Sequence, residues 1–469
     1  MKTLIIYSKK YTSYSELGFL KSLNANEYFF LCLDDEEDYI KYFNKIGLNK
    51  FIVYLEIYFS KLLKLFKPKE IFLENIIEND MSCNDIFYVV NFNCKKKLDE
   101  FLKKHNLPLI HLKSNNSLSR LINRKPYLDG ELILTSSDEN SSLYKFQIPN
   151  SISLLINDKI LNLTALQIFI KIKKNLKNIK FEEVKLTNDK ILNFNHNIIY
   201  LIRLFSFFGT YKKKSKGYSV YYKPIKSTRE IKLTPTKKKN YFADPFIIEH
   251  ENFSIIFHEE FDFILNRGVI SATSIEGDKN KYLGVILKED FHLSFPYIFE
   301  DNGKLYMIPE SNKSNSIRLY ECVSFPMKWE FKKTLINNID SADNILIKKN
   351  STYYILANEK FGNYHGGLSV YFSKDLLSDN WTSHSKNPIE VKYVSRNGGI
   401  IKFQDNYIIP KQVYNYLSYG DSLNFYDLQE LSIENVIFKV NYNFNSKQLI
   451  NSHHFNRSNN YIVYDKKNI

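Results

Sequence analysis

Cysteine is scarce in this chain, with four residues among 469, at Cys32, Cys83, Cys94 and Cys322. No two of them form a CxxC pair or share the spacing of a metal-binding motif. A zinc site of the usual kind and a disulfide framework both need paired cysteines, so neither is expected. We interpret the four residues as reduced, structural thiols, and the sequence predicts no metal site.

Long hydrophobic runs are also missing. No stretch reaches the roughly 18 to 20 consecutive apolar residues that a membrane-spanning helix needs, and the N-terminus, MKTLIIYSKK, has only a short apolar run before two lysines. We therefore expect a cytoplasmic protein, with a peripheral position at the inner face of the membrane as an option. The chain also lacks a GxGxxG or Walker loop, so no nucleotide cofactor can be named from a motif.

Positive charge is concentrated in one segment. The chain carries a net charge of +14, and residues 212–239 hold ten Lys and one Arg against Glu230, which gives 11 − 1 = +10. The segment follows the apolar run NIIYLIRLFSFFGTY (197–211). Two interpretations stay open: an interfacial helix on an anionic membrane or beside a lipid-linked acceptor, and a buried inter-domain helix followed by a solvated loop. Nucleic acid is not expected as a partner, because no binding motif accompanies the charge.

The N-terminal part, residues 1–195, reads as an α/β domain. Short apolar strands are expected at 3–8, 28–33, 86–92 and 107–113, separated by periodic stretches such as 39–68 that are typical of helices. Residues 196–216 would form a linker helix with apolar and basic character.

A repeat decides the architecture of the remainder, residues 217–469. The repeated pattern consists of a strand, a polar turn and a second strand. Its copies start at residues 244, 295, 343, 397 and 453. The spacings of 51, 48, 54 and 56 residues are close to the roughly 50 of kelch-type propeller blades. We therefore predict an all-β five-bladed β-propeller after the α/β domain.

The repeat places polar residues at one end of every hairpin. In an antiparallel hairpin the start of the first strand and the end of the second share an edge, and these edges would converge around the channel. Crowded carboxylates shift one another's pKa and are what glycosyl chemistry uses, but such residues can also simply satisfy strand ends. The residues expected there are Asp244, Asp343, Asn397 and His453 from first strands, and Glu259, Glu260, Glu310, Glu359, Gln412 and Asp465 from second strands.

The order of motifs resembles a known family. FADPFII (242–248), FPYIFEDNGKLYMIPES (295–311) and SRNGGIIKFQDNYIIPKQ (395–412) look like the propeller domain at the N-terminus of glucosamine inositolphosphorylceramide transferases and their bacterial relatives. That domain is itself similar to the five-bladed propellers of family-43 glycoside hydrolases. The domain that precedes it in bacterial relatives resembles formyltransferases. Here no Asn-x-His arrangement is evident, which implies at most a degenerate domain of that kind.

The resemblance implies roles for individual residues. Asp244 matches the general base of family-43 hydrolases, and Asp343 an aspartate that tunes the acid. The acid of those hydrolases lies in a Glu-Gly-Pro context, which this sequence lacks. We therefore expect Glu310 to act as the catalytic acid in its place, with Glu359 as the second candidate. Substrate contacts are assigned to Glu259, His292, Arg318, Glu359, Arg396, Gln412 and His453. His453 would organise water or a structural ion in the channel, or be a structural histidine.

Three functions follow as alternatives. The first is a glycosyltransferase-like enzyme of surface polysaccharide or glycolipid biosynthesis, acting on a sugar or glycan. The second is a non-catalytic glycan-binding or scaffold propeller, and the third a family-43-like glycosidase. Fold alone does not separate them, because propellers serve all three.

Overall fold

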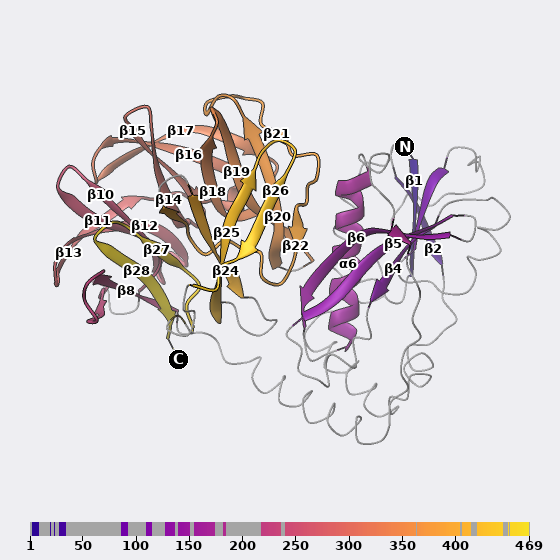
Figure 1. The fold of residues 1–469 in the computed structure, drawn as a ribbon, viewed down its shortest axis with the longest axis horizontal. Helices are drawn as coiled ribbons and strands as arrows, with labels where there is room; N and C mark the ends of the chain where they lie inside the picture. The colour runs from indigo at the N-terminus through magenta and orange to yellow at the C-terminus, as the bar shows by residue number, and fades with distance from the viewer. Residues whose placement is uncertain are drawn as a thin grey trace, which may run out of the picture. The chain divides into compact units, whose positions relative to one another are not determined.

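The computed structural model describes two units of the chain, residues 1–213 and 214–469, which are treated separately. Figure 1 shows both, with the remaining chain in grey. The predicted linker helix and the three lysines at 237–239 lie outside the described residues. The described residues are 2–8, 19, 23, 28–33, 86–91, 109–114, 127–136, 139–150, 154–173, 182–183, 217–235, 240–362, 364–403, 406–413, 420–443, 449 and 451–468.

The first unit contains one mixed sheet with the strand order β2-β1-β3-β4-β5-β6-β7. Strands β1 to β4 pair in parallel, and β5 to β7 continue the sheet in antiparallel fashion. The helix α6 (Leu154–Ile172) contacts β4 and β5. The strands are β1 (Lys2–Ser8), β2 (Tyr28–Leu33), β3 (Ile86–Asn91), β4 (Leu109–Ser114), β5 (Tyr127–Ser136), β6 (Glu139–Pro149) and β7 (Glu182–Glu183).

Strands β1 to β4 coincide with the four strands expected from the sequence. The helical stretch expected at 39–68 lies outside the described residues, so the α/β assignment of this unit stays a prediction. No helix in the described part of the chain is long and apolar enough to cross a bilayer.

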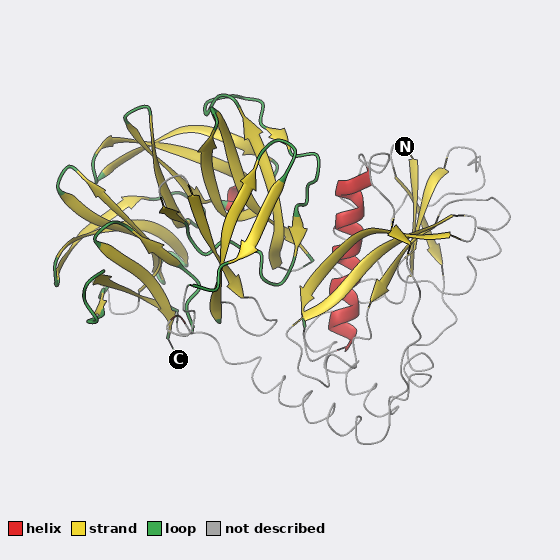
Figure 2. Ribbon diagram, viewed as in Figure 1, coloured by secondary structure: helices red, strands yellow, loops and turns green. Residues whose placement is uncertain are grey.

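The second unit is built of antiparallel sheets in which strands adjacent in sequence pair with one another (Figure 2). We call them the first to fifth sheets. The first sheet is β10 (Tyr241–His250), β11 (Phe253–Asp262), β12 (Arg267–Glu276) and β13 (Lys279–Leu287); the second is β14 (Ser294–Asp301), β15 (Lys304–Glu310), β16 (Ser316–Ser324) and β17 (Lys328–Asn337); the third is β18 (Ser341–Lys349), β19 (Thr352–Phe361), β20 (Tyr364–Ser373) and β21 (Thr382–Ser383), with β22 (Glu390–Val391) also paired to β20; the fourth is β23 (Ile401–Phe403), β24 (Asn406–Val413), β25 (Ser422–Leu431) and β26 (Val436–Val440); the fifth is β27 (Phe455–Arg457), β28 (Tyr461–Lys467), β8 (Tyr218–Pro224) and β9 (Ile231–Lys232).

The fifth sheet joins the two ends of this unit. Strand β28, near the C-terminus, pairs with β8, and Tyr464 lies opposite Tyr221. The repeat in the sequence does not reveal this closure, because β8 and β9 precede the first copy. Apolar side chains from adjacent sheets fill the space between them, and Phe257, Met307 and Trp329 share one such cluster.

The first strands of three sheets begin with the same backbone irregularity. The ladder skips between Ala243 and Phe246 in β10, and equivalent shifts occur in β14 and β18. The skipped residues include Asp244 (φ 51°), Phe295 (φ 46°) and Asp343 (φ 47°). Left-handed backbone in a non-glycine residue is uncommon. Its recurrence at one position of the repeat shows that each strand turns here by the same bulge.

The hairpin register corrects one detail of the sequence interpretation. The pairs His250–Phe253, Asp301–Lys304, Lys349–Thr352 and Phe403–Asn406 close four equivalent turns. Counting from these turns, the positions equivalent to Glu259 are Glu310, Asn358 and Gln412. Glu359 therefore lies one residue beyond the expected position, and one residue along a strand reverses the face to which a side chain points.

Gly399 lies where the fourth and fifth sheets meet. Its φ is +116°, and a Cβ atom there would lie 2.0 Å from the carbonyl oxygen of Phe455. The backbone nitrogen of Phe455 donates to the carbonyl of Gly398 at 2.8 Å, so the chains cannot separate without losing this bond. Only glycine fits both the angle and the space.

We expect Gly399→Ala to lower the free energy of unfolding of the second unit by more than about 3 kcal/mol, because backbone strain and overlap add. The matched control is Gly303→Ala, where φ is +74° but nothing lies within 4 Å of the added Cβ, and backbone strain alone costs about 1–2 kcal/mol. Urea unfolding followed by tryptophan fluorescence measures both, since the only tryptophans, Trp329 and Trp381, lie in this unit. An equal decrease in the free energy of unfolding for the two variants would contradict the close approach of Gly399 to Phe455.

Candidate functional site

Asp244 connects three sheets. It lies in the bulge of β10, and Pro245 after it needs no ladder hydrogen bond. Its backbone nitrogen donates to Oδ2 of Asp465 in the fifth sheet at 3.1 Å, and its own Oδ2 accepts from the backbone nitrogen of Phe295 in the second sheet at 3.2 Å. The side chain is therefore held at the inner start of the first strand, with 4% of the residue exposed.

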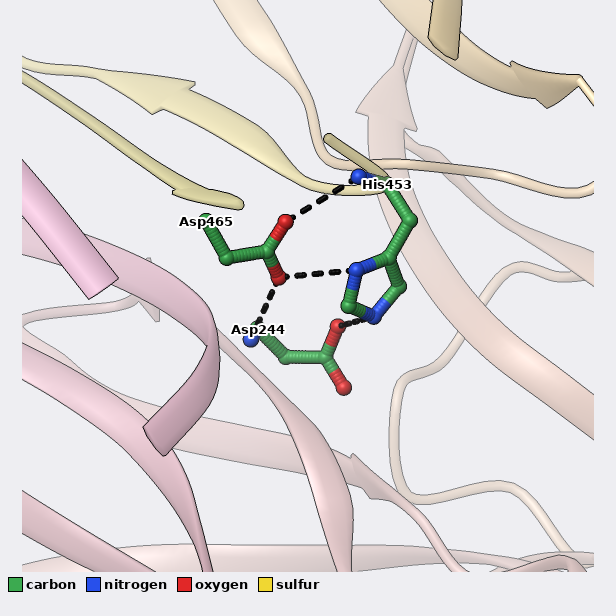
Figure 3. Close-up of side chains that lie close together, drawn as sticks. All are labelled: Asp244, His453 and Asp465. Atoms are coloured by element: carbon green, nitrogen blue, oxygen red, sulfur yellow. Dashed lines mark hydrogen bonds and ion pairs between the residues drawn. The ribbon is translucent and has the colours of Figure 1, made fainter. Parts of the chain in front are cut away.

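His453 lies between two carboxylates (Figure 3). Its Nε2 is 3.0 Å from Oδ1 of Asp244, and its Nδ1 is 3.0 Å from Oδ2 of Asp465. Both contacts are ion pairs when the imidazole carries a proton on each nitrogen. His453 and Asp244 come from opposite ends of the second unit's sequence, and the fold brings them together.

The charges of this group determine its pKa values. Burial would lower the pKa of His453, but Asp465 and Asp244 outweigh it and raise the pKa to about 10. Burial would raise the pKa of Asp244, but the neighbouring His453 outweighs burial and lowers the pKa to about 2. At neutral pH His453 is therefore an imidazolium and Asp244 a carboxylate.

Asp465 and His454 complete this group. The repeat placed Asp465 at the inner end of its hairpin without assigning it a catalytic or binding role, and His454 was not nominated from the sequence. The carboxylate of Asp465 accepts backbone N–H groups of Asp244, His453 and His454 at 3.0–3.1 Å. His454 is fully buried, its Nδ1 is 3.7 Å from Oδ1 of Asp244, and burial lowers its pKa. The His-His pair at the fifth repeat start was the signal available in the sequence, but which histidine faces Asp244 depends on the fold.

A second carboxylate pair is held by one arginine. Arg396 donates from Nε to Oδ2 of Asp343 at 2.6 Å and from Nη2 to Oδ1 at 3.2 Å. The same Nη2 donates to Oε2 of Glu310 at 3.0 Å. Burial raises the pKa of Glu310 well above its usual range; Arg396 opposes this, and a hydrogen bond with Asp343 adds to it. The pair therefore holds a proton on Glu310 to higher pH than an exposed glutamate would.

Glu259 is the other carboxyl with a raised pKa. Burial is the main cause, and the negative charge of Asp244 adds to it. His292 lies beside it, with Nε2 3.6 Å from Oε1 of Glu259. Because Nδ1 of His292 accepts from the backbone nitrogen of Gly268 at 2.8 Å, we assign the ring proton to Nε2, facing Glu259. Burial lowers the pKa of His292, so this ring is neutral.

Gln412 and Asn397 support Asp343. Gln412 donates from Nε2 to Oδ2 of Asp343 at 2.7 Å and to the carbonyl of Asn397 at 2.6 Å. Asn397 donates to the backbone carbonyl of Asp343 at 2.9 Å, and its own backbone nitrogen donates to Oδ1 of Asn358 at 2.8 Å. Both amides are fully buried, so in this structure they position Asp343.

Glu359 and Arg318 are placed elsewhere. Glu359 is equivalent by register to Glu260. Each carboxylate accepts a tyrosine hydroxyl: Glu359 from Tyr371 on the adjacent strand β20 at 2.8 Å, and Glu260 from Tyr282 on β13, two strands away, at 2.6 Å.

Arg318 belongs to β16, a third strand. It contacts Glu289 at 3.4 Å and lies over the rings of Phe291 and Phe331 at 5.0 and 4.9 Å, rather than contacting the carboxylates described above. A sequence motif alone does not tell an inner strand from an outer one, which explains why Arg318 was grouped with the site.

One possible cation site exists among the described residues. Asp244, His453 and Asp465 each offer a ligand atom, and these atoms lie within 4.8 Å of one another. A metal would have to displace the proton that gives His453 its charge, because only a neutral imidazole nitrogen binds a metal. The observed arrangement is that of an internal ion pair.

The buried imidazolium should give the second unit a characteristic pH dependence. The folded pKa of about 10 is above the unfolded value of about 6.5, so the folded state binds more protons between these values and stability falls as pH rises. One proton corresponds to about 1.4 kcal/mol per pH unit. We expect His453→Gln to remove this slope between pH 7 and 9 and to cost about 3–5 kcal/mol at pH 7, because two buried carboxylates lose their counter-charge.

Urea unfolding at several pH values, followed by tryptophan fluorescence, measures the slope. The matched control is His454→Gln, which removes a neighbouring histidine that is already neutral and should leave the slope in place. An unchanged slope in His453→Gln would contradict the charge state assigned to His453.

Comparison with known proteins places this site in a family. The profile of the family described as "Glucosamine inositolphosphorylceramide transferase 1, N-terminal" matches residues 208–463, more than half of the chain. Curated proteins with the name "Glucosamine inositolphosphorylceramide transferase 1" are similar: the one from Arabidopsis thaliana is 31% identical over 168 residues, and the one from Oryza sativa subsp. japonica 30% over 215 residues. These alignments cover 34% and 43% of this chain but 22% and 28% of the relatives, so the chain spans about a quarter of their length.

Solved structures of glycoside hydrolases are more distant. A thermostable family-43 glycoside hydrolase matches with a TM-score of 0.36 and 14% identity, covering 50% of this chain and 91% of its own. A family 117 glycoside hydrolase from Zobellia galactanivorans matches with a TM-score of 0.37 and 12% identity, covering 54% and 91%. The resemblance predicted from the sequence motifs is confirmed by the family match. The chain belongs to the family of glucosamine inositolphosphorylceramide transferase 1 N-terminal domains.

Proposed function

We propose that this protein is a glycosyl-transferring enzyme of glycolipid or surface polysaccharide biosynthesis, and that its site lies among the inner strands of a five-bladed propeller. Family membership supports this proposal, because the curated relatives are named as transferases. The matched relatives are about four times as long as the part aligned here, so their activity reaches this chain only as a proposal.

The observation that carries the proposal is the opposite protonation of neighbouring carboxyls. Asp244 is ionised because His453 lowers its pKa to about 2. Glu310 and Glu259 have raised pKa values, chiefly because they are buried, and the charge of Asp244 contributes to both. Glycosyl transfer needs one carboxylate that accepts a proton or stabilises positive charge and one carboxylic acid that donates a proton.

The proposed step assigns a role to each group. The acceptor hydroxyl oxygen forms a bond to the anomeric carbon of the donor as the bond from that carbon to the leaving oxygen breaks. Asp244 takes the hydroxyl proton, its negative charge stabilises the developing oxocarbenium ion until then, and Glu310 gives its proton to the leaving oxygen. Arg396 positions Glu310 and Asp343, and Asp343 helps to keep Glu310 protonated.

A second candidate is a non-catalytic glycan-binding propeller. Low exposure of the carboxyls favours it, since Asp244 is 4% and Glu310 5% exposed, whereas His292 and Arg396 are the more accessible groups, at 28% and 14% of their side chains. A family-43-like glycosidase is a third candidate, although the Glu-Gly-Pro context of the acid is missing.

We expect Asp244→Asn to lower transfer at least about 10³-fold while glycan affinity persists, because Asn keeps the size and tolerates left-handed backbone. The unit should stay folded at reduced stability, since His453 loses one of its two carboxylate partners. Glu310→Gln should also slow transfer and should remove the loss of activity at high pH, since Gln cannot lose a proton. Initial rates with sugar-nucleotide, lipid-linked and aryl-glycoside donors across pH measure both. Glu321→Gln is the matched control. Glu321 lies on the outer strand β16 and pairs with Lys304 and Lys332.

Full activity of Asp244→Asn would remove Asp244 from catalysis. Glycan binding by the wild-type protein without turnover of any donor would favour the binding module, and hydrolysis of aryl glycosides without transfer would favour the glycosidase.

A further inference from the structure

An apolar turn joins β11 to β12. Its successive residues Phe263, Ile264 and Leu265 are 50%, 85% and 38% exposed. Single exposed apolar side chains are common on proteins, but a contiguous group marks an interaction surface more often. We call these three residues the apolar tip.

The backbone holds the apolar tip outward. Oδ1 of Asp262 accepts the backbone nitrogens of Ile264 at 2.8 Å and Leu265 at 3.2 Å. Asn266 then adopts a φ of 53° to lead into β12. The turn is thus ordered by polar contacts, which leaves its apolar side chains available.

The apolar tip lies at the same end of the first sheet as Glu259, because β11 runs from its hairpin through Glu259 to the turn. The ring of Phe263 lies 5.1 Å from that of Phe261 and 6.0 Å from that of Tyr241. Phe261 lies 6.2 Å from the ring of His292, whose Nε2 is 3.6 Å from Glu259. A continuous group of rings therefore links the apolar tip to the candidate site.

Size and charge indicate what the apolar tip contacts. A stable protein interface needs roughly 800 Å² from each partner, more than three side chains supply. A lipid surface needs only a few apolar side chains that enter the headgroup region together with positive charge, and each nearby Lys or Arg strengthens binding to anionic lipid about fivefold. The chain has a net charge of +14, and the basic segment 212–239 ends two residues before Tyr241 in the sequence.

We propose that the apolar tip inserts into the surface of a bilayer that contains anionic lipids. This rests on the proposed function, because it presents the candidate site to an acceptor whose sugar lies at the lipid–water boundary. The partner is a membrane surface, and the contact is made by the first sheet of the second unit.

The test is cosedimentation of the full chain with phosphatidylcholine vesicles that contain or lack phosphatidylglycerol. The variant Phe263→Ser/Ile264→Ser/Leu265→Ser should bind the anionic vesicles at least about tenfold more weakly than wild type, because apolar area no longer leaves water. The matched control is Val323→Ser/Met327→Ser/Ile433→Ser, whose residues are 46%, 41% and 52% exposed. Val323 lies near the end of the third strand β16, and Met327 and Ile433 lie in turns after third strands, at the opposite end of their sheets. Their substitution should leave binding within about twofold of wild type.

Equal binding of the tip variant and wild type would overturn the proposal, as would failure of the wild type to bind either vesicle. If the wild type runs as a dimer in gel filtration and the tip variant runs as a monomer, the apolar tip contacts a second copy of the chain. This result would also overturn the proposal. Asp244→Asn should bind vesicles like the wild type. Absence of glycosyl transfer in every assay would therefore contradict the proposed function without changing the vesicle result.

Discussion

The ion pair of His453 with Asp244 and Asp465 is the interaction on which the second unit depends. Asp244 opens the first sheet, whereas His453 and Asp465 belong to the region of the last sheet, which β8 completes from the start of the unit. The contact therefore joins the first and last sheets and holds Asp244 as a carboxylate. Burying three charged groups is costly unless each is compensated, and here the imidazolium and several backbone N–H groups provide the compensation.

The two carboxyl pairs of the candidate site contain the same kinds of groups but differ in their protonation. Each has two carboxyls and one cation: Asp244 and Asp465 with His453, and Asp343 and Glu310 with Arg396. Asp465 accepts three backbone N–H groups, and the imidazolium of His453 outweighs burial at Asp244 and lowers its pKa. At Glu310, burial raises the pKa although Arg396 opposes it, and the neighbouring charge of Asp343 adds to the rise. The balance between burial and the nearby cation thus separates a carboxylate from a carboxylic acid.

Much of this site follows from periodicity. The repeat identified the starts of the first strands, and antiparallel pairing placed Asp244, Glu310, Asp343 and Gln412 at one end of their sheets, where the structure has them. Periodicity does not resolve single-residue register, and Glu359 was chosen where the hairpin register places Asn358. It also does not distinguish inner from outer strands, which is why Arg318 was included. The roles of Asp465 and His454, and the pairing of β8 with β28, depend on contacts between distant parts of the sequence that no local pattern encodes.

The charge state of His453 is the claim that most directly supports this account, because it makes Asp244 a carboxylate and joins the first and last sheets. The direct measurement is an NMR titration of the histidine ring nitrogens in ¹⁵N-histidine-labelled protein, with the signal of His453 identified as the one missing from His453→Gln. The account predicts an imidazolium signature that persists to about pH 9, since the pKa is raised to about 10. A neutral ring with one protonated nitrogen at pH 7.5 would contradict it.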